Sequence, residues 1–93
     1  INALFFAAGG VYGGCRAIIS LGLTGKLCVI AFDKADTTEH FLQEGVLSAV
    51  ICQQPRIQGS KPLDLLFAYL TSGELPEEEY NYTAVDIRIL ENI

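Results

Sequence analysis

The chain of 93 residues has no methionine and no tryptophan, a single histidine, three prolines and few basic residues. The missing methionine predicts that the chain is not a complete translation product, and we expect it to be a piece of a larger protein. Six lysines and arginines are scattered singly among eleven acidic residues, which gives a net charge of −5. The absence of any basic run argues against nucleic-acid binding by this segment.

Long apolar runs and clusters of metal ligands are missing as well. No apolar run approaches the roughly 18 residues that a membrane span needs, so we expect no membrane partner. The three cysteines, Cys15, Cys28 and Cys52, are odd in number, widely spaced and set among apolar residues. His40 is the one imidazole and has no partner at catalytic spacing. We therefore expect no metal, no cofactor, no disulfide and no enzyme activity, and buried free thiols favour the cytoplasm.

The stretch that organises the chain is KLCVIAFDK, residues 26–34. Leu27 to Phe32 is an unbroken run of strand-forming residues, which predicts a strand buried on both faces of a parallel sheet. Asp33 ends the run, at the carboxyl end of the strand, where α/β sheets bind ligands. Two interpretations of Asp33 follow: it contacts a ligand, or it caps the next helix, since aspartate is a preferred N-cap.

Apolar strands alternate with helical segments along the whole chain. The predicted architecture is therefore α/β, a three-layer, mostly parallel and doubly wound sheet with right-handed crossovers. Two short strands near the end of the chain are expected at a sheet edge. The strands are expected over 2–7, 27–32, 46–52, 80–85 and 86–90, and the helices over 11–21, from Thr37 or Thr38 to Gly45, and over 60–72 with Pro62 in the first turn.

Two further polar or glycine-rich positions follow predicted strands. Gln53 comes directly after the third strand, where an amide that both donates and accepts would suit a sugar hydroxyl, or would simply be a solvated loop residue. GGVYGG, residues 9–14, fits neither dinucleotide nor phosphate-loop spacing. The second glycine pair, Gly13 and Gly14, is expected to let the helix pack closely on the sheet.

The order of several motifs resembles a known family over essentially the whole chain. These motifs are Arg16-Ala17-Ile18 after a Gly/Ala-rich helix start, VIAFD, Gly45-Val46 leading into SAVICQQP, Gln58-Gly59, and the tail DIRILENI. Together they resemble the carboxyl-terminal lobe of the sugar-sensing domain of LacI-type (LacI/GalR) repressors. That domain has the periplasmic-binding-protein type I fold and is shared with secreted sugar receptors of transporters.

The resemblance implies roles for three residues. Asp33 and Gln53 match positions that hydrogen bond the hydroxyl groups of a sugar-like effector held between two lobes. Tyr12 lies on a helix whose surface helps to form the repressor dimer, so it becomes a candidate interface residue, the alternative being a partly exposed tyrosine over the sheet edge. One departure is that the polar residues usual after the first strand are replaced by Ala7 and Ala8, followed by Gly9 and Gly10.

The function predicted from the resemblance is an effector-sensing lobe of a cytoplasmic, homodimeric transcriptional regulator. All 93 residues would then form part of one domain, with the DNA-binding helix-turn-helix and the amino-terminal lobe upstream. The alternative is a lobe of a secreted sugar-binding receptor of a membrane transporter. An enzyme is a weaker hypothesis, because Asp33 is the one obvious acid and has no catalytic partner.

Overall fold

A computed structural model describes all 93 residues. They form two compact units, and the chain passes from one unit to the other twice. The first unit consists of Ile1–Cys52 and Asp86–Ile93, and the second of Gln53–Val85. The sheet and two helices belong to the first unit, and a long helix forms most of the second. The assignment of the whole chain to one carboxyl-terminal lobe stays a prediction.

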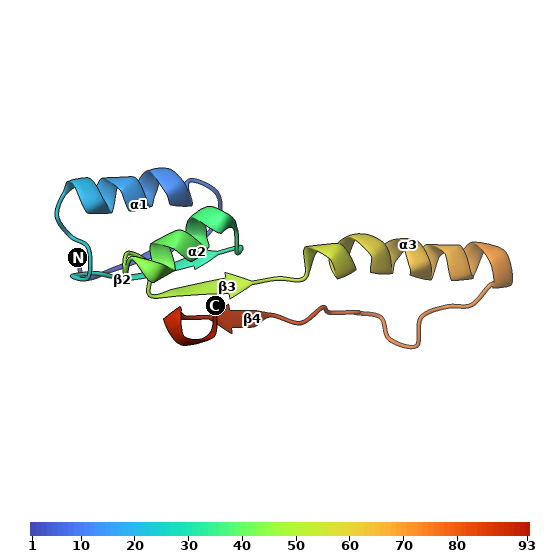
Figure 1. Cartoon of the computed structure of the whole chain (residues 1–93). Helices are drawn as coiled ribbons and strands as arrows, with labels where there is room; N and C mark the ends of the chain where they lie inside the picture. The colour runs from blue at the N-terminus through green and yellow to red at the C-terminus, as the bar shows by residue number, and fades with distance from the viewer. The chain divides into compact units, whose positions relative to one another are not determined.

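The first unit is a four-stranded, mostly parallel sheet with two helices, which confirms the predicted α/β fold class (Figure 1). The sheet order is β1-β2-β3-β4; β1, β2 and β3 are parallel, and β4 joins the edge beside β3 in the antiparallel direction. In chain order the elements are β1 (Ala3–Phe6), α1 (Val11–Ser20), β2 (Cys28–Phe32), α2 (Asp36–Gln43), β3 (Ala49–Cys52), β4 (Asp86–Arg88) and a 3-10 turn (Leu90–Asn92).

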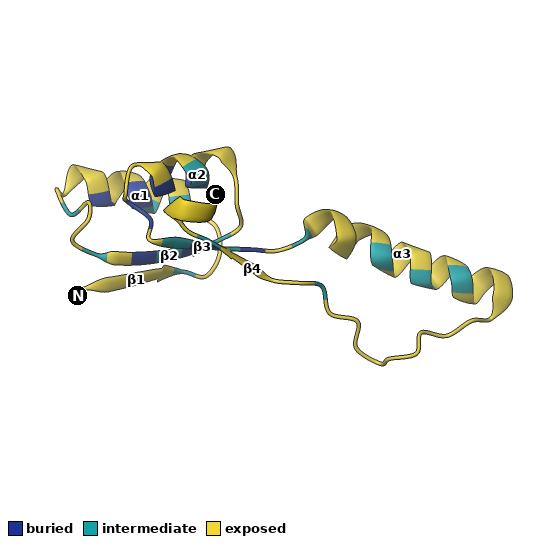
Figure 2. Ribbon diagram, turned by 60° about the horizontal axis from the view of Figure 1, so that its bottom comes forward, coloured by how far each residue is buried: buried dark blue, intermediate teal, exposed yellow.

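The core lies between the two helices and one face of the sheet. Side chains alternate along β2 and β3, so that Val29 and Ala31 on β2 and Val50 on β3 are fully buried on the helix-covered face. Figure 2 shows the buried residues gathered on these strands and on α1 and α2. Burial of each of the two valines contributes about 1.5–3 kcal/mol, which makes this layer the main source of stability. The core comprises Cys15, Ile18, Val29, Ala31, Phe41, Leu42, Val46, Leu47, Val50 and Cys52.

Of the two glycines proposed to bring the helix close to the sheet, only Gly14 does so. A Cβ atom at Gly14 would clash with the ring of Phe6 on β1, whereas one at Gly13 would meet nothing within 4 Å. The expectation is therefore confirmed for Gly14 and wrong for Gly13, which lies on the open side of α1.

The second unit contains α3 (Pro55–Ser72) and the extended segment that follows it. The prediction that this helix begins near Ser60 is wrong, because Pro55 occupies the first helical position, where its fixed φ and missing N–H are tolerated. Pro62 consequently lies inside the helix. The strand expected over 80–85 does not form, whereas β4 does. No residue of α3 is buried (Figure 2).

The two adjacent glycines of α1 provide a matched test of this packing. Gly14→Ala is expected to lower the free energy of unfolding by about 1–3 kcal/mol, because the methyl group overlaps the Phe6 ring. Gly13→Ala is expected to raise it by about 0.5–1 kcal/mol, since alanine is the better helix former. Urea unfolding of both variants measures the difference, and equal effects would contradict the close approach of α1 to β1.

Candidate functional site

Asp33 follows the last residue of β2 in a backbone conformation that is unusual for a residue other than glycine. Its φ is 71°, the one positive φ among the non-glycine residues. Its N–H donates to the carbonyl of Ile51 at 2.8 Å, which ties the end of β2 to the neighbouring β3. A left-handed conformation costs about 1–2 kcal/mol for most residues and less for aspartate, whose short polar side chain tolerates it. The exposed carboxylate is thus held at a fixed point on the carboxyl edge of the parallel strands.

The helix after β2 is not capped by Asp33, which removes the simpler interpretation of this residue. The N-cap of α2 is Ala35, in an extended conformation, and no N-cap side chain bonds the helix. Thr38, in the first turn of α2, instead contacts the backbone of Ala35 with its hydroxyl group. The Ala35 N–H donates to Thr38 Oγ1 at 2.6 Å, and the Thr38 hydroxyl lies 2.8 Å from the Ala35 carbonyl oxygen. The prediction that Thr37 or Thr38 is the N-cap is therefore wrong, because Ala35 occupies that position. Thr38 nevertheless hydrogen bonds the backbone of the N-cap residue.

Gln53 is the first residue of the second unit and directly follows β3 along the chain. Its side-chain oxygen accepts a hydrogen bond of 3.1 Å from the amide of Gln58, one turn into α3. The same Gln58 amide donates to Thr83 Oγ1, also at 3.1 Å. Gln58 therefore fixes the orientation of the Gln53 amide, a positioning role that the sequence pattern did not indicate.

The neighbouring Gln54 has a structural role. Its side-chain oxygen accepts from the Ala84 N–H at 3.0 Å, which joins the start of α3 to the segment that leads back toward β4. Gln54 thus holds the backbone, whereas Gln53, the glutamine that was predicted to bind a ligand, is exposed. Asp33 and Gln53 belong to different units, and each directly follows one of two parallel strands that are neighbours in the sheet.

Tyr12 lies on the first turn of α1 and is 57% exposed. Its ring is tilted against that of Phe41 on α2, with 5.9 Å between the ring centroids. One side of the ring therefore packs on the core, and the other is available to a partner. Its proposed role at a dimer interface stays a prediction.

The cysteines are all unpaired, but they differ in environment. Cys15 and Cys52 are buried, and burial raises the pKa of the Cys15 thiol above its ordinary value. Cys28 is exposed, so the expectation that all three thiols are buried is wrong for this one. The cause is its place on the sheet face opposite the two helices.

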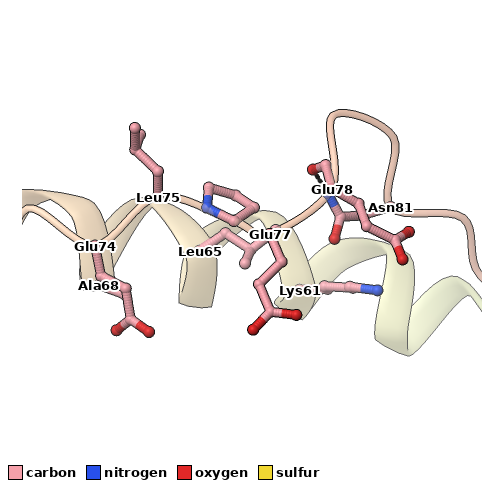
Figure 3. A pocket seen from close by; sticks show the side chains of 9 residues that line it. Lys61, Leu65, Ala68, Glu74, Leu75, Glu77, Glu78 and Asn81 are labelled. Carbon is pink, nitrogen blue, oxygen red and sulfur yellow. Dashed lines mark hydrogen bonds between the residues drawn. The ribbon is translucent and has the colours of Figure 1, made fainter.

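A hollow in the second unit does not include the predicted site residues (Figure 3). It has a volume of about 500 Å³ and lies between α3, which contributes Lys61, Leu65 and Ala68, and residues 74–81, which contribute three glutamates. No group of three or more potential metal-ligating side chains occurs, and none of the helices combines the length and apolarity needed to cross a bilayer. The ligand-binding role of Asp33 and Gln53 stays a prediction.

No protein-family model and no curated protein matches the chain, but solved structures match its fold closely. A solute-binding protein of an ABC transporter from Agrobacterium vitis, with bound D-fucose, is 31% identical over 99% of the chain, with a TM-score of 0.87. A carbohydrate-transporter solute-binding protein from Agrobacterium radiobacter, in complex with D-arabinose, is 27% identical over 99%, with a TM-score of 0.84. A putative LacI transcriptional regulator from Bacteroides fragilis is 23% identical over 99%, with a TM-score of 0.84.

The fold is that of a periplasmic-binding-protein-like lobe. The chain spans 31% of the length of each of these three proteins. Transporter binding proteins and a regulator share the fold, and none of the three is named as an enzyme. The likeness to the regulator, at 23% identity, concerns the fold alone.

Substitutions at Asp33 test its backbone conformation without any ligand. Asp33→Ala is expected to be less stable than Asp33→Gly by about 1 kcal/mol, because alanine pays the left-handed penalty that glycine avoids. Thermal or urea unfolding of the two variants measures this difference. If alanine proves as stable as glycine, the positive φ at this position is refuted.

Thiol reactivity tests the environments of the cysteines. One thiol per folded chain is expected to react rapidly with a disulfide reagent at pH 8, and two only after denaturation, because Cys15 and Cys52 are buried. Cys28→Ser is expected to abolish the rapid reaction, whereas Cys52→Ser should leave it unchanged. A rapid reaction that survives in Cys28→Ser would show that the core is open to solvent.

Proposed function

We propose that this chain is part of a carbohydrate-binding protein in which Asp33 and Gln53 hydrogen bond hydroxyl groups of the ligand. The observation that carries the proposal is the geometry of Asp33. An acidic residue stands in a left-handed conformation directly after a buried parallel strand, and it does not serve as the cap of the next helix. Strained backbone of this kind is concentrated at functional sites, and ligands of α/β sheets bind at the carboxyl ends of strands.

The chemistry of the two side chains suits a neutral polyhydroxylated ligand. A carboxylate accepts charge-assisted hydrogen bonds from hydroxyl groups, and such bonds are stronger than those between neutral groups. An amide both donates and accepts, and Gln58 holds the Gln53 amide in one orientation. D-fucose and D-arabinose, bound by the two transporter proteins of similar fold, are ligands of this class.

Residues 7–10, Ala-Ala-Gly-Gly, distinguish this chain from the family pattern at the end of β1. They offer no side-chain hydrogen bond, so polar contacts there would have to come from backbone groups. Gly10 has a φ of 89°, a conformation that a larger polar residue would adopt only with strain. We infer that the ligand is recognised chiefly at the ends of β2 and β3.

Two kinds of whole protein are compatible with this role, and each is favoured by a different observation. Three unpaired cysteines favour an intracellular transcriptional regulator, which would act as a homodimer through Tyr12 and bind DNA through an upstream domain. The higher identities to solute-binding proteins, 31% and 27%, favour a secreted receptor of a membrane transporter. The coding sequence upstream of Ile1 separates them, because a regulator requires a helix-turn-helix and a receptor a secretory signal peptide.

Ligand titration of the full-length gene product tests the binding role. Calorimetry with D-fucose and D-arabinose is expected to detect binding that Asp33→Asn weakens by about tenfold or more, since a hydrogen bond to a charged group contributes about 1.5–3 kcal/mol. The stability of this variant should change little, because asparagine also tolerates the left-handed conformation.

The matched control is Asp64→Asn, the same substitution on α3. It should leave the affinity unchanged. If neither sugar binds, the assignment to this ligand class is wrong. If binding occurs but Asp33→Asn and Asp64→Asn have equal affinities, Asp33 is not a ligand-binding residue.

A further inference from the structure

The segment between α3 and β4 contains a sequence that accepts a covalent carbohydrate. Residues 79–83 read Glu-Tyr-Asn-Tyr-Thr, so the hydroxyl of Thr83 stands two positions after Asn81, with a tyrosine between them and an alanine after them. Asn-x-Ser/Thr, with x other than proline, is the sequence at which asparagine is N-glycosylated, and its expected place is a surface loop. Asn2, by contrast, is followed by alanine and leucine and does not match.

The structure around Asn81 provides the loop that such a site requires. Residues 73–85, between the end of α3 and the start of β4, form neither helix nor strand, and Asn81 is exposed. The rings of Tyr80 and Tyr82 stack on each other, with 6.0 Å between their centroids, and do not shield the asparagine between them. An exposed segment of this kind can enter the active site of a modifying enzyme without unfolding any helix or strand.

The Asn81 amide is oriented in a way that is compatible with an attached sugar. Its Nδ2 donates a hydrogen bond of 3.0 Å to the carbonyl of Glu78 (Figure 3). A primary amide has two N–H groups, and glycosylation replaces one of them with a bond from the nitrogen to a sugar carbon. The bond to Glu78 needs the other N–H alone, so the glycosylated side chain keeps this contact.

The residues on either side of Asn81 present groups that an enzyme could recognise. Glu79 places an exposed carboxylate two positions before the asparagine, as in the longer Asp/Glu-x-Asn-x-Ser/Thr form of the acceptor sequence that bacterial oligosaccharyltransferases use. Thr83 Oγ1 accepts a hydrogen bond of 3.1 Å from the amide of Gln58. A hydrogen bond of this kind contributes about 0.5–1.5 kcal/mol, so an enzyme could bind the Thr83 hydroxyl in its place at small cost.

We propose that Asn81 is N-glycosylated by transfer of an oligosaccharide from a lipid-linked diphosphate donor. The new bond joins Asn81 Nδ2 to the anomeric carbon of the first sugar, and the bond from that carbon to the diphosphate oxygen breaks. The lipid diphosphate leaves with the electron pair, a base of the transferase takes the amide proton, and nothing is oxidised or reduced. Because such donors face away from the cytoplasm, the proposal rests on the secreted-receptor form of the proposed function, but it does not depend on Asp33 or Gln53.

Mass spectrometry of the full-length gene product, purified from the cells that encode it, tests the proposal. The peptide containing Asn81 is expected to carry a glycan, and the peptide containing Asn2 is expected to carry none. Digestion after denaturation releases any sugar that is bound without a covalent bond, so the result does not depend on the calorimetric titration. An unmodified Asn81 would overturn the proposal even if the protein binds D-fucose or D-arabinose.

Threonine substitutions test whether the acceptor sequence directs the attachment. Thr83→Ala is expected to lower the glycosylated fraction by about tenfold or more, because the hydroxyl of the acceptor sequence is lost, whereas Thr83→Ser should retain glycosylation. Thr71→Ala removes an exposed threonine on α3 and is the matched control, which should leave the fraction unchanged. Equal glycosylation of Thr83→Ala and Thr71→Ala would show that the acceptor sequence is not used.

Discussion

The parallel pairing of β2 with both β1 and β3 is the constraint on which the rest of the first unit depends. A central strand in a parallel sheet is usually covered on both faces, and the side chains of β2 are apolar or cysteine on both sides. On one side, Val29 and Ala31 form the floor of the core under α1 and α2. On the other, Ile30 and Phe32 lie on the face that α1 and α2 do not cover. The same pairing brings the carboxyl ends of β2 and β3 to one edge of the sheet. Asp33 directly follows β2 at this edge.

The end of β2 shows how packing and chemistry are connected. The hydrogen bond from the Asp33 N–H to the Ile51 carbonyl extends the pairing one residue beyond the strand. The chain must then turn sharply toward α2, and the turn is made by a residue in the left-handed region. Glycine would make the turn at lower cost. The use of an aspartate places a carboxylate at the edge of the sheet, where glycine would offer no functional group.

Much of the first unit could be predicted from the sequence because its strands are short, continuous apolar runs with helical periods between them. Hydrophobic pattern alone could not locate the start of α3, where the tolerance of Pro55 at the first helical position outweighed the expected break. Nor could it tell Gly14, where a Cβ atom would clash with Phe6, from Gly13, where a Cβ atom would meet nothing within 4 Å. That distinction depends on the rotation of α1 about its axis. The positive φ of Asp33 was likewise invisible, since an aspartate after a strand also suits a helix cap.

The burial of the cysteines is another feature that the hydrophobic pattern of the sequence does not determine. An apolar neighbourhood in sequence predicted three buried thiols, but alternation along β2 puts Cys28 on the face that α1 and α2 do not cover. Burial is a property of the layers packed on a strand, and sequence context does not reveal which of the two faces has its layer.

A crystal structure of the full-length gene product with a bound sugar tests the central claim most directly. The account predicts a sugar hydroxyl about 2.5–3.0 Å from the carboxylate of Asp33, the range of a strong O–H···O hydrogen bond. A sugar bound elsewhere, with the Asp33 carboxylate contacting only protein groups, would contradict it.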